Sequence, residues 1–248
     1  MVRRLVICLL AFSIMISITA CSSTKITKET NSSYVSISGG KSYQIPLKDK
    51  KVNYSDEDFK NLYSQYLKSN NITLETSPES DKTGMSKEQQ LKYYTVHDIT
   101  PEEVKKELHC QIFKVNYTCD TFVIYKGKLF PIALGFGGFG VVSLSTCDFD
   151  EDGKKDLIYT FSWGSGLHRS HIGIFNLAKE KEEWLDFVQE NDDIMVEKIL
   201  DKSFKIYIAN ISSQTDSYFT HFTLSKKDNI GNIQKIEGKV KATKTTMK

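Results

Sequence analysis

Four aspartates fall within nine positions of the stretch DFDEDGKKD, which runs from Asp148 to Asp156. At neutral pH, repulsion between the carboxylates would push such a segment apart, so a bound cation is the simplest reason for the pattern. Calcium takes about six to eight oxygen ligands, and a flexible loop can supply them from alternate positions because consecutive side chains point away from one another. We therefore expect this loop to bind Ca²⁺.

The predicted ligands are three alternating carboxylates, one backbone carbonyl and a final carboxylate. In chain order they are Asp148, Asp150, Asp152, the carbonyl of Lys154, and Asp156. The alternative is an acidic hairpin turn that holds no ion, since Asp is also frequent in turns. We expect the bound calcium to be structural, because mass action at extracellular calcium concentrations would stabilise the fold by about 1.4 kcal/mol.

The residues within and after this loop distinguish an EF-hand from other kinds of calcium-binding loop. Gly153 permits the sharp turn that closes the ligand cage. An EF-hand loop would need a glutamate at its twelfth position, where this chain has Tyr159, and the flanks are not helical in pattern. The EF-hand family is therefore excluded.

The flanks match a different kind of calcium loop. From Phe139 to Gly166 the chain reads FGVVSLSTCDFDEDGKKDLIYTFSWGSG. This segment resembles the FG-GAP or VCBS-type loop of integrin-like propellers. The resemblance implies a loop between two antiparallel strands that holds one calcium through its four aspartates. The chain has one copy of the motif, whereas a propeller needs several blades, so the resemblance covers the loop and not the propeller fold.

A second polar stretch follows, from Gly164 to His171, with the sequence GSGLHRSH. The rings of His168 and His171 and the guanidinium of Arg169 could converge on an anion or a second metal. The alternative is a turn whose polar groups satisfy the local backbone. Histidines three residues apart on an extended segment point to opposite sides, which argues against one shared site.

The N-terminus has the pattern of an export signal, with Arg3 and Arg4 before an apolar run that ends at Ala20. The next residues, Ile18-Thr19-Ala20-Cys21, resemble the lipobox of bacterial lipoproteins. In that family the signal is removed before the cysteine, which carries a diacylglycerol and a further acyl chain such as palmitate. The resemblance implies a lipid anchor on Cys21. The alternatives are an ordinary secretory signal or a short membrane helix.

The charge balance argues against a nucleic-acid partner. The chain has 33 basic and 31 acidic residues, and loss of Arg3 and Arg4 with the signal would leave equal numbers. It has no long basic run interleaved with aromatic residues. We expect a membrane partner through the lipid, and an envelope polymer or a protein as a further partner, but no nucleic acid.

Three cysteines remain once Cys8 leaves with the signal and Cys21 is acylated. Cys110 and Cys119 flank the segment QIFKVNYT, which could fold as strand, turn and strand and bring the two thiols together as a disulfide. Pairing with Cys147 is a second arrangement. The third alternative is that all three are small buried side chains.

The pattern along the chain predicts three segments. Residues 1–20 form the signal peptide, residues 21–45 form a flexible tether rich in Ser, Thr and Lys, and residues 46–248 form one domain. Within the domain, Ser55 caps a helix whose apolar residues recur at helical spacing. Thr100-Pro101-Glu102-Glu103 reads as a capping box that opens a second helix, ending near Leu108. A third short helix could end the polar loop that precedes it.

Short β-branched and aromatic runs dominate the chain after Cys110. We expect a hairpin at Lys126-Gly127 and further strands in VVSLST, DLIYTFSW, HIGIFNLA, SFKIYIAN, SYFTHFTLS and IQKIEGKV. The predicted fold class is α+β, a mainly antiparallel β-sheet with two or three short helices toward the N-terminal side.

These observations predict a non-enzymatic, calcium-binding lipoprotein of the bacterial cell membrane. It would face outside the cytoplasm and act as a binding or cell-envelope accessory domain. The alternative function is an envelope hydrolase that uses His168, Arg169 and His171 near the metal. A third is a surface-interaction module in which calcium braces a hairpin. The sequence names neither a ligand nor a reaction.

Overall fold

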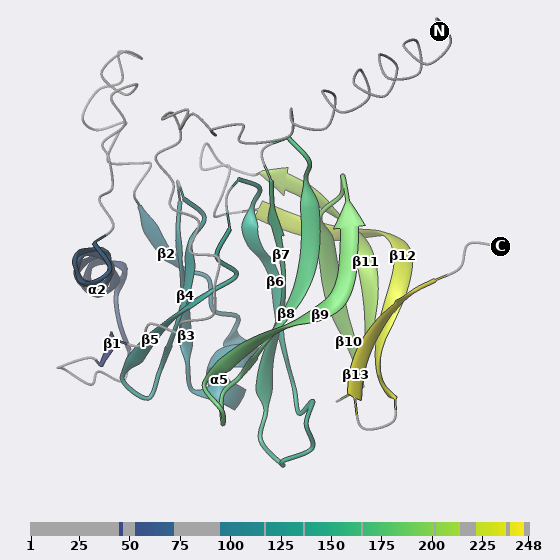
Figure 1. The fold of residues 1–248 in the computed structure, drawn as a ribbon, viewed down its shortest axis with the longest axis horizontal. Helices are drawn as coiled ribbons and strands as arrows, with labels where there is room; N and C mark the ends of the chain where they lie inside the picture. The colour runs from purple at the N-terminus through teal and green to yellow at the C-terminus, as the bar shows by residue number, and fades with distance from the viewer. Residues whose placement is uncertain are drawn as a thin grey trace, which may run out of the picture. The chain divides into compact units, whose positions relative to one another are not determined.

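Three antiparallel sheets and two helices make up the part of the chain that this computed structural model describes (Figure 1). All of these residues belong to one compact unit, Tyr34–Lys248. The described residues are 45–46, 53–71, 95–116, 118–135, 137–164, 166–200, 202–213, 222–236 and 239–245.

The first sheet has the strand order β1-β5-β4-β3-β2. Helix α2 (Asp56–Ser69) packs against it and places the Phe59 ring 4.5 Å from that of Phe113. The predicted Ser55 cap is confirmed, and Asp58 completes it as a reciprocal capping box that satisfies the first amides of the helix. The strands are β1 (Ile45–Pro46), β2 (Val96–Asp98), β3 (Gln111–Val115), β4 (Thr121–Tyr125) and β5 (Lys128–Ile132).

Two local predictions in this region have different outcomes. The hairpin between β4 and β5 is confirmed, and both turn residues, Lys126 and Gly127, have positive φ, as a two-residue turn requires. Helix α5 (Glu102–Leu108) also forms, but its N-cap is Pro101, without a side-chain cap. The predicted capping box is wrong because the Thr100 hydroxyl bonds to Asp98 instead.

The second sheet, β6-β7-β8-β9, lies between the first and the third sheets (Figure 1). Its side chains contribute to two hydrophobic clusters. Alternate side chains of β7, such as Leu157 and Tyr159, pack with the first sheet and α5. The intervening Ile158 packs toward the third sheet. The strands are β6 (Gly140–Cys147), β7 (Asp156–Trp163), β8 (Arg169–Asn176) and β9 (Lys181–Glu190). The near-continuous apolar runs of β7 and β8 reflect burial on both faces.

The third sheet is built from consecutive antiparallel neighbours. Its inner face places Phe204, Ile206 and Ile233 in the cluster shared with the second sheet. The strands are β10 (Ile194–Leu200), β11 (Ser203–Ser213), β12 (Phe222–Ile236) and β13 (Lys239–Lys244). The sequence patterns do not predict β9 or β10, because their polar residues interrupt the apolar ones without strict alternation.

Of the three arrangements that the sequence leaves open for these cysteines, the structure has the third, because Cys110, Cys119 and Cys147 are free and buried. Cys110 precedes β3, and Cys119 lies in the turn after it, since the chain reverses beyond Val115 and not midway between the cysteines. The strand between them spans about 16 Å, whereas a disulfide needs Cα atoms within about 7 Å. Burial raises the pKa of the Cys110 thiol to about 12 and that of Cys119 to about 11, which disfavours the reactive thiolates.

The predicted mainly antiparallel architecture, with helices toward the N-terminal side, is confirmed for the described residues. The predicted signal peptide, Cys21, the tether up to residue 44 and the third helix lie outside them. None of the described helices is both long and apolar enough to cross a membrane.

Candidate metal site

The predicted calcium loop connects β6 and β7, and its last residue, Asp156, pairs with Cys147 at the base of the hairpin. Glu151 and Gly153 both have positive φ, at 62° and 81°. Glycine adopts this backbone conformation without the steric cost that Cβ imposes on other residues. The backbone therefore turns twice within the loop, and this brings its alternating aspartates together.

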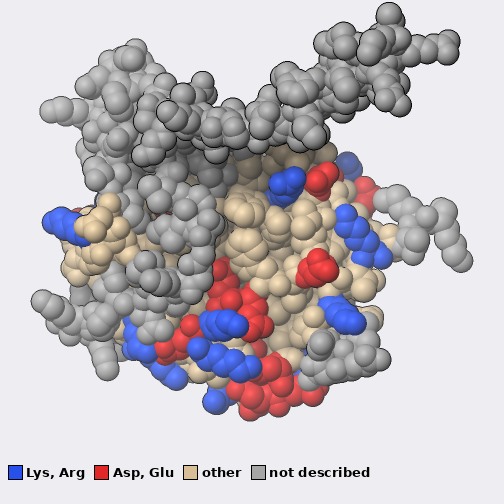
Figure 2. Space-filling view, viewed as in Figure 1, with Lys and Arg blue, Asp and Glu red and all other residues tan. Residues whose placement is uncertain are grey.

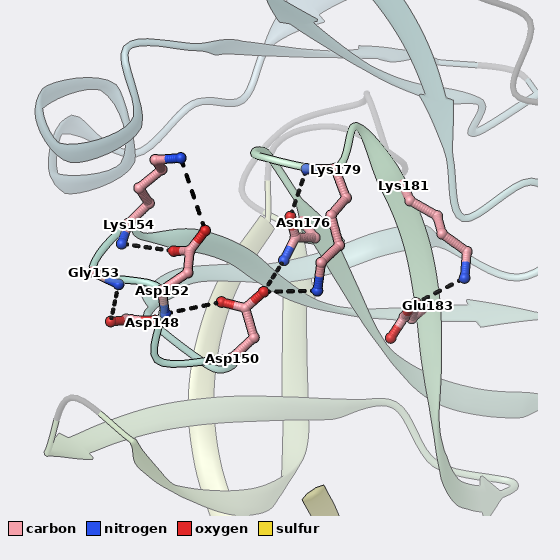
Figure 3. A network of polar contacts seen from close by, with 9 residues as sticks. All are labelled: Asp148, Asp150, Asp152, Gly153, Lys154, Asn176, Lys179, Lys181 and Glu183. Atoms are coloured by element: carbon pink, nitrogen blue, oxygen red, sulfur yellow. Dashed lines mark hydrogen bonds and ion pairs between the residues drawn. The ribbon is translucent and has the colours of Figure 1, made fainter. Parts of the chain in front are cut away.

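Asp148, Asp150 and Asp152 each offer a carboxylate oxygen within 4.8 Å of the other two. Figure 3 shows the loop folding around these side chains. The amide of Gly153 donates to Asp148 Oδ2 at 3.1 Å, and the amide of Lys154 donates to Asp152 Oδ1 at 2.8 Å. These backbone bonds orient the carboxylates, so the three aspartates could hold a metal ion.

Residues outside the loop partly neutralise Asp150. Lys179 Nζ and Asn176 Nδ2 donate to Asp150 Oδ2 at 2.8 and 2.9 Å (Figure 3). The hydrogen bond from Lys179 is the main reason that the pKa of Asp150 lies below its usual value. Asp150 is therefore ionised, and residues at the end of β8 and just after it hold its side chain in place. The negative charges of the other two clustered carboxylates, Asp148 and Asp152, are less well compensated.

Asp156 lies outside the group of three but within their electrostatic influence. It is 1% exposed, and burial, followed by the charge of Asp150, raises the pKa of its carboxyl to about 7. Its Oδ2 and the Oδ1 of Asp148 are buried oxygens without a hydrogen-bond partner among the described residues. Orphaned buried oxygens are costly, and a bound cation would compensate both.

The donor set fits a hard cation. The clustered atoms are all carboxylate oxygens, which suit calcium or magnesium better than zinc. If an ion bound here, it would hold the two strands at the hairpin tip and favour ionised Asp156. The predicted contribution of the Lys154 carbonyl stays a prediction.

The second predicted loop does not converge on one site. His168 Nε2 lies 3.1 Å from Asp193 Oδ1, and Arg169 Nε lies 3.7 Å from Glu190 Oε1. His171, on β8, instead stacks on Phe161, with ring centroids 5.4 Å apart. The two histidines have separate partners, as their spacing on an extended segment predicts.

Two grooves lie in the described part of the fold, and the acidic loop itself lines part of the first. One, of about 1130 Å³, adjoins the acidic loop and is lined by lysines that include Lys105, Lys126 and Lys155. The other, of about 410 Å³, lies beside β6 and β10. Neither has His168 or His171 in its lining.

Sequence reasoning missed two residues that contact Asp150 from outside the loop, one at the end of β8 and one just after it. Asn176 and Lys179 are distant from Asp150 along the chain and reach it only through the pairing of β7 with β8. The pairing of β7 with β8 and of β8 with β9 gathers Trp163, His171 and Trp184, whose ring centroids lie 5.3 to 5.6 Å apart. No local motif marks either group.

Comparison with known proteins adds no family to this description. No protein-family model, no curated protein and no solved structure matches the chain.

Proposed function

We propose that this protein is an exported lipoprotein, anchored through Cys21, whose α+β domain binds one calcium ion in loop 148–156. The domain serves as a binding or accessory module of the cell envelope and not as an enzyme. The observation that carries the calcium proposal is the cluster of Asp148, Asp150 and Asp152 beside two buried carboxylate oxygens that have no described partner.

The chemistry of these groups supports calcium as the ion. The loop offers several carboxylates on a flexible hairpin, which suits the larger and more variable coordination of calcium better than the strict octahedron of magnesium. An exported location would supply millimolar calcium, at which a site of modest affinity is occupied. The ion would then stabilise the hairpin rather than report a signal.

The hydrolase alternative receives less support. It requires His168 and His171 to face one another beside a carboxylate in a cleft. Only His168 has a carboxylate partner in the described contacts, and His171 lies among aromatic rings. We therefore favour the binding role.

The calcium proposal is tested by thermal unfolding of the full chain in detergent, with calcium, with magnesium and with a chelator. Calcium at tenfold above its dissociation constant should add about 1.4 kcal/mol. Asp152→Asn should remove most of this gain, and Glu183→Gln, which breaks an exposed pair with Lys181 on the same sheet, should keep it. Equal gains in both variants, or no gain in the wild-type chain, would overturn the proposal.

The anchor is tested separately by mass spectrometry of protein extracted from membranes. We expect a mature N-terminus at Cys21 that carries diacylglycerol, and a Cys21→Ala chain that keeps residues 1–20. A mature chain without lipid would overturn the anchoring proposal and leave the calcium proposal standing.

A further inference from the structure

The larger groove gathers lysine side chains in a chain that is nearly neutral as a whole. The chain has 33 basic and 31 acidic residues. The described lining of this groove, of about 1130 Å³, contains four lysines and a single acidic residue, which are Lys105, Lys126, Lys154, Lys155 and Glu107. Figure 2 shows lysine or arginine side chains between groups of acidic ones along the lower edge of this face, the end where Figure 1 places α5. We call this feature the lysine groove.

Three separate elements contribute the lysines. Lys105 belongs to the last turn of α5, and Lys126 lies at the β4–β5 turn, where its positive φ of 48° helps to form the reversal. Lys154 and Lys155 come from the end of the acidic loop. The groove is therefore built by the fold and not by one run of basic residues.

The negative charges at the groove already have partners. Glu107 Oε2 lies 3.2 Å from Lys155 Nζ, and both side chains are about one-third exposed. On the loop, Asp152 Oδ2 lies 3.9 Å from Lys154 Nζ. These pairs reduce the repulsion that an anion in the groove would meet.

Lys105 and Lys126 carry charge that no such pair compensates. Neither lysine forms an ion pair with an acidic residue in the described part of the chain. Lys126 is exposed, and its Nζ lies 4.8 Å from the centroid of the Tyr125 ring, whereas Lys105 is half-buried. A groove lined by charges of one sign raises the local concentration of ligands of the opposite sign.

The type of cation and the size of the groove narrow the class of anion. The described lining contains no arginine, whose planar fork suits bidentate binding of a carboxylate. An ammonium group acts as a point charge with three donors, which suits the several oxygens of a phosphate. A volume of about 1130 Å³ exceeds what a single phosphate ion fills, so a ligand with several phosphate groups fits the groove better.

Two other polyanions fit less well. An acidic peptide that adds to a sheet needs an open strand edge, and the strand residues in the described lining belong to β3 and β4, which are inner strands. A single-stranded nucleic acid needs exposed ring faces for its bases. Of the tyrosines in this lining, Tyr54 is only 8% exposed, and Lys126 Nζ lies over the ring of Tyr125.

We propose that the lysine groove binds a chain of phosphate groups, whose oxygens accept hydrogen bonds from the ammonium groups of Lys105 and Lys126. Such a chain could be a free polyphosphate or a phosphodiester segment of an envelope polymer, which share this chemistry. The inference names a ligand class for the binding role proposed above and rests on that role. It depends on neither the calcium ion nor the lipid anchor.

Calorimetric titration of the full chain in detergent, in calcium-free buffer of low salt, tests the inference. The probes are inorganic tripolyphosphate and a phosphodiester-linked trimer of glycerol phosphate. We expect saturable binding of at least one, weakened by added salt, and at least tenfold weaker binding of single inorganic phosphate and of citrate. Tighter binding of tripolyphosphate would identify a free polyphosphate as the better ligand, and tighter binding of the trimer would identify a polymer segment.

Two results of these titrations would overturn the inference. One is that neither phosphate probe binds. The other is that citrate, or a single-stranded DNA trimer, binds as tightly as the better of the two phosphate probes, because the groove would then not select a phosphate chain.

Lysine variants assign the binding to the groove. Lys105→Gln and Lys126→Gln should each weaken it about two- to fivefold, and the double variant about tenfold or more. Lys241→Gln removes the same charge from an exposed position on β13, outside the groove, and should bind as the wild type does. Equal affinities in the double variant and this control, with unchanged melting temperatures, would overturn the inference.

A calcium titration of the same preparation separates the two proposals. If calcium raises the melting temperature and neither phosphate probe binds, only the inference about the groove fails. If a phosphate probe binds and calcium has no effect, the calcium proposal fails and the inference about the groove stands.

Discussion

In the acidic loop, nine consecutive residues bring their side chains together through their own backbone turns, and two of the clustered aspartates are exposed. In the aromatic platform, which is formed by the packed rings of Phe161, Trp163, His171 and Trp184, residues from three strands meet only because β7, β8 and β9 pair in a particular register. The loop presents oxygens to an ion, whereas in the platform the unpaired ring nitrogens of Trp163 and His171 are buried. Both lie on the second sheet.

This difference predicts how each region should respond to amino-acid substitutions. Local geometry depends on backbone conformation and charge, so single changes in the loop should alter ion binding with a small effect on the core. Register-dependent geometry depends on packing between strands, so changes in the sheet should disturb the platform and the core together. The variants below separate the two responses, from the largest expected effect to the smallest.

Gly173→Ala should be the most destabilising of these changes. The added Cβ would meet the buried Tyr159 ring, and overpacking of this kind costs about 1 to 3 kcal/mol. Chemical unfolding followed by tryptophan emission measures this loss and the disturbed platform together, while calcium affinity should stay unchanged. Gly166→Ala, where a Cβ meets nothing within 4 Å, is the control. Similar stability of the two variants would contradict register-dependent packing here.

Asp156→Asn should stabilise the calcium-free protein at high pH and remove most of the stability that calcium adds. The raised pKa of Asp156 means that the folded, calcium-free state resists ionisation, so wild-type stability should fall as pH rises from about 4 to about 7. Asparagine cannot ionise, so the variant should lack this fall and be more stable at pH 8 without calcium, by on the order of 1 to 2 kcal/mol.

With calcium present, the same variant should gain little, because it lacks one predicted ligand. Thermal unfolding from pH 4 to pH 8, with calcium and with chelator, measures both effects. A wild-type chain whose calcium-free stability rises between pH 4 and pH 7 would contradict the buried, uncompensated state of Asp156.

Gly153→Ala should cost about 1 kcal/mol, since an alanine at φ 81° is strained even though the space around it is open. Calcium affinity should fall as well, because relief of this strain would shift the backbone amide that orients Asp148. Calorimetric titration with calcium measures the second effect, and tryptophan emission should show an unchanged platform. Loss of the platform signal in this variant would mean that the two regions are coupled.

Lys179→Gln should have the smallest effect. Its pair with Asp150 is partly exposed and screened by solvent, so stability should change little. Calcium affinity should rise about two- to threefold at low salt, because removing a nearby positive charge favours a divalent cation, and the rise should shrink at high salt. A fall in affinity would show that Lys179 acts mainly by orienting Asp150.

The sequence predicts what is encoded in contiguous residues. The Ser55 cap, the Lys126-Gly127 turn and the acidic loop each depend on a few neighbours, and the structure contains all three. The mainly antiparallel architecture also follows, because short β-branched runs with small turns leave few other arrangements.

What depends on pairing between distant residues could not be predicted in this way. The bracing of Asp150 by Lys179 and the meeting of Trp163 with Trp184 follow from strand register, which no local pattern specifies. The Cys110–Cys119 disulfide fails for the same reason, since it depends on where the chain reverses after β3.

The most direct test of the central claim is a crystal structure of the protein grown with calcium. The account predicts one ion in loop 148–156, with carboxylate oxygens of Asp148, Asp150 and Asp152 at about 2.3 to 2.6 Å and the buried oxygen of Asp156 turned toward it. A loop in which these side chains point into solvent around no ion, at calcium concentrations of several millimolar, would contradict it.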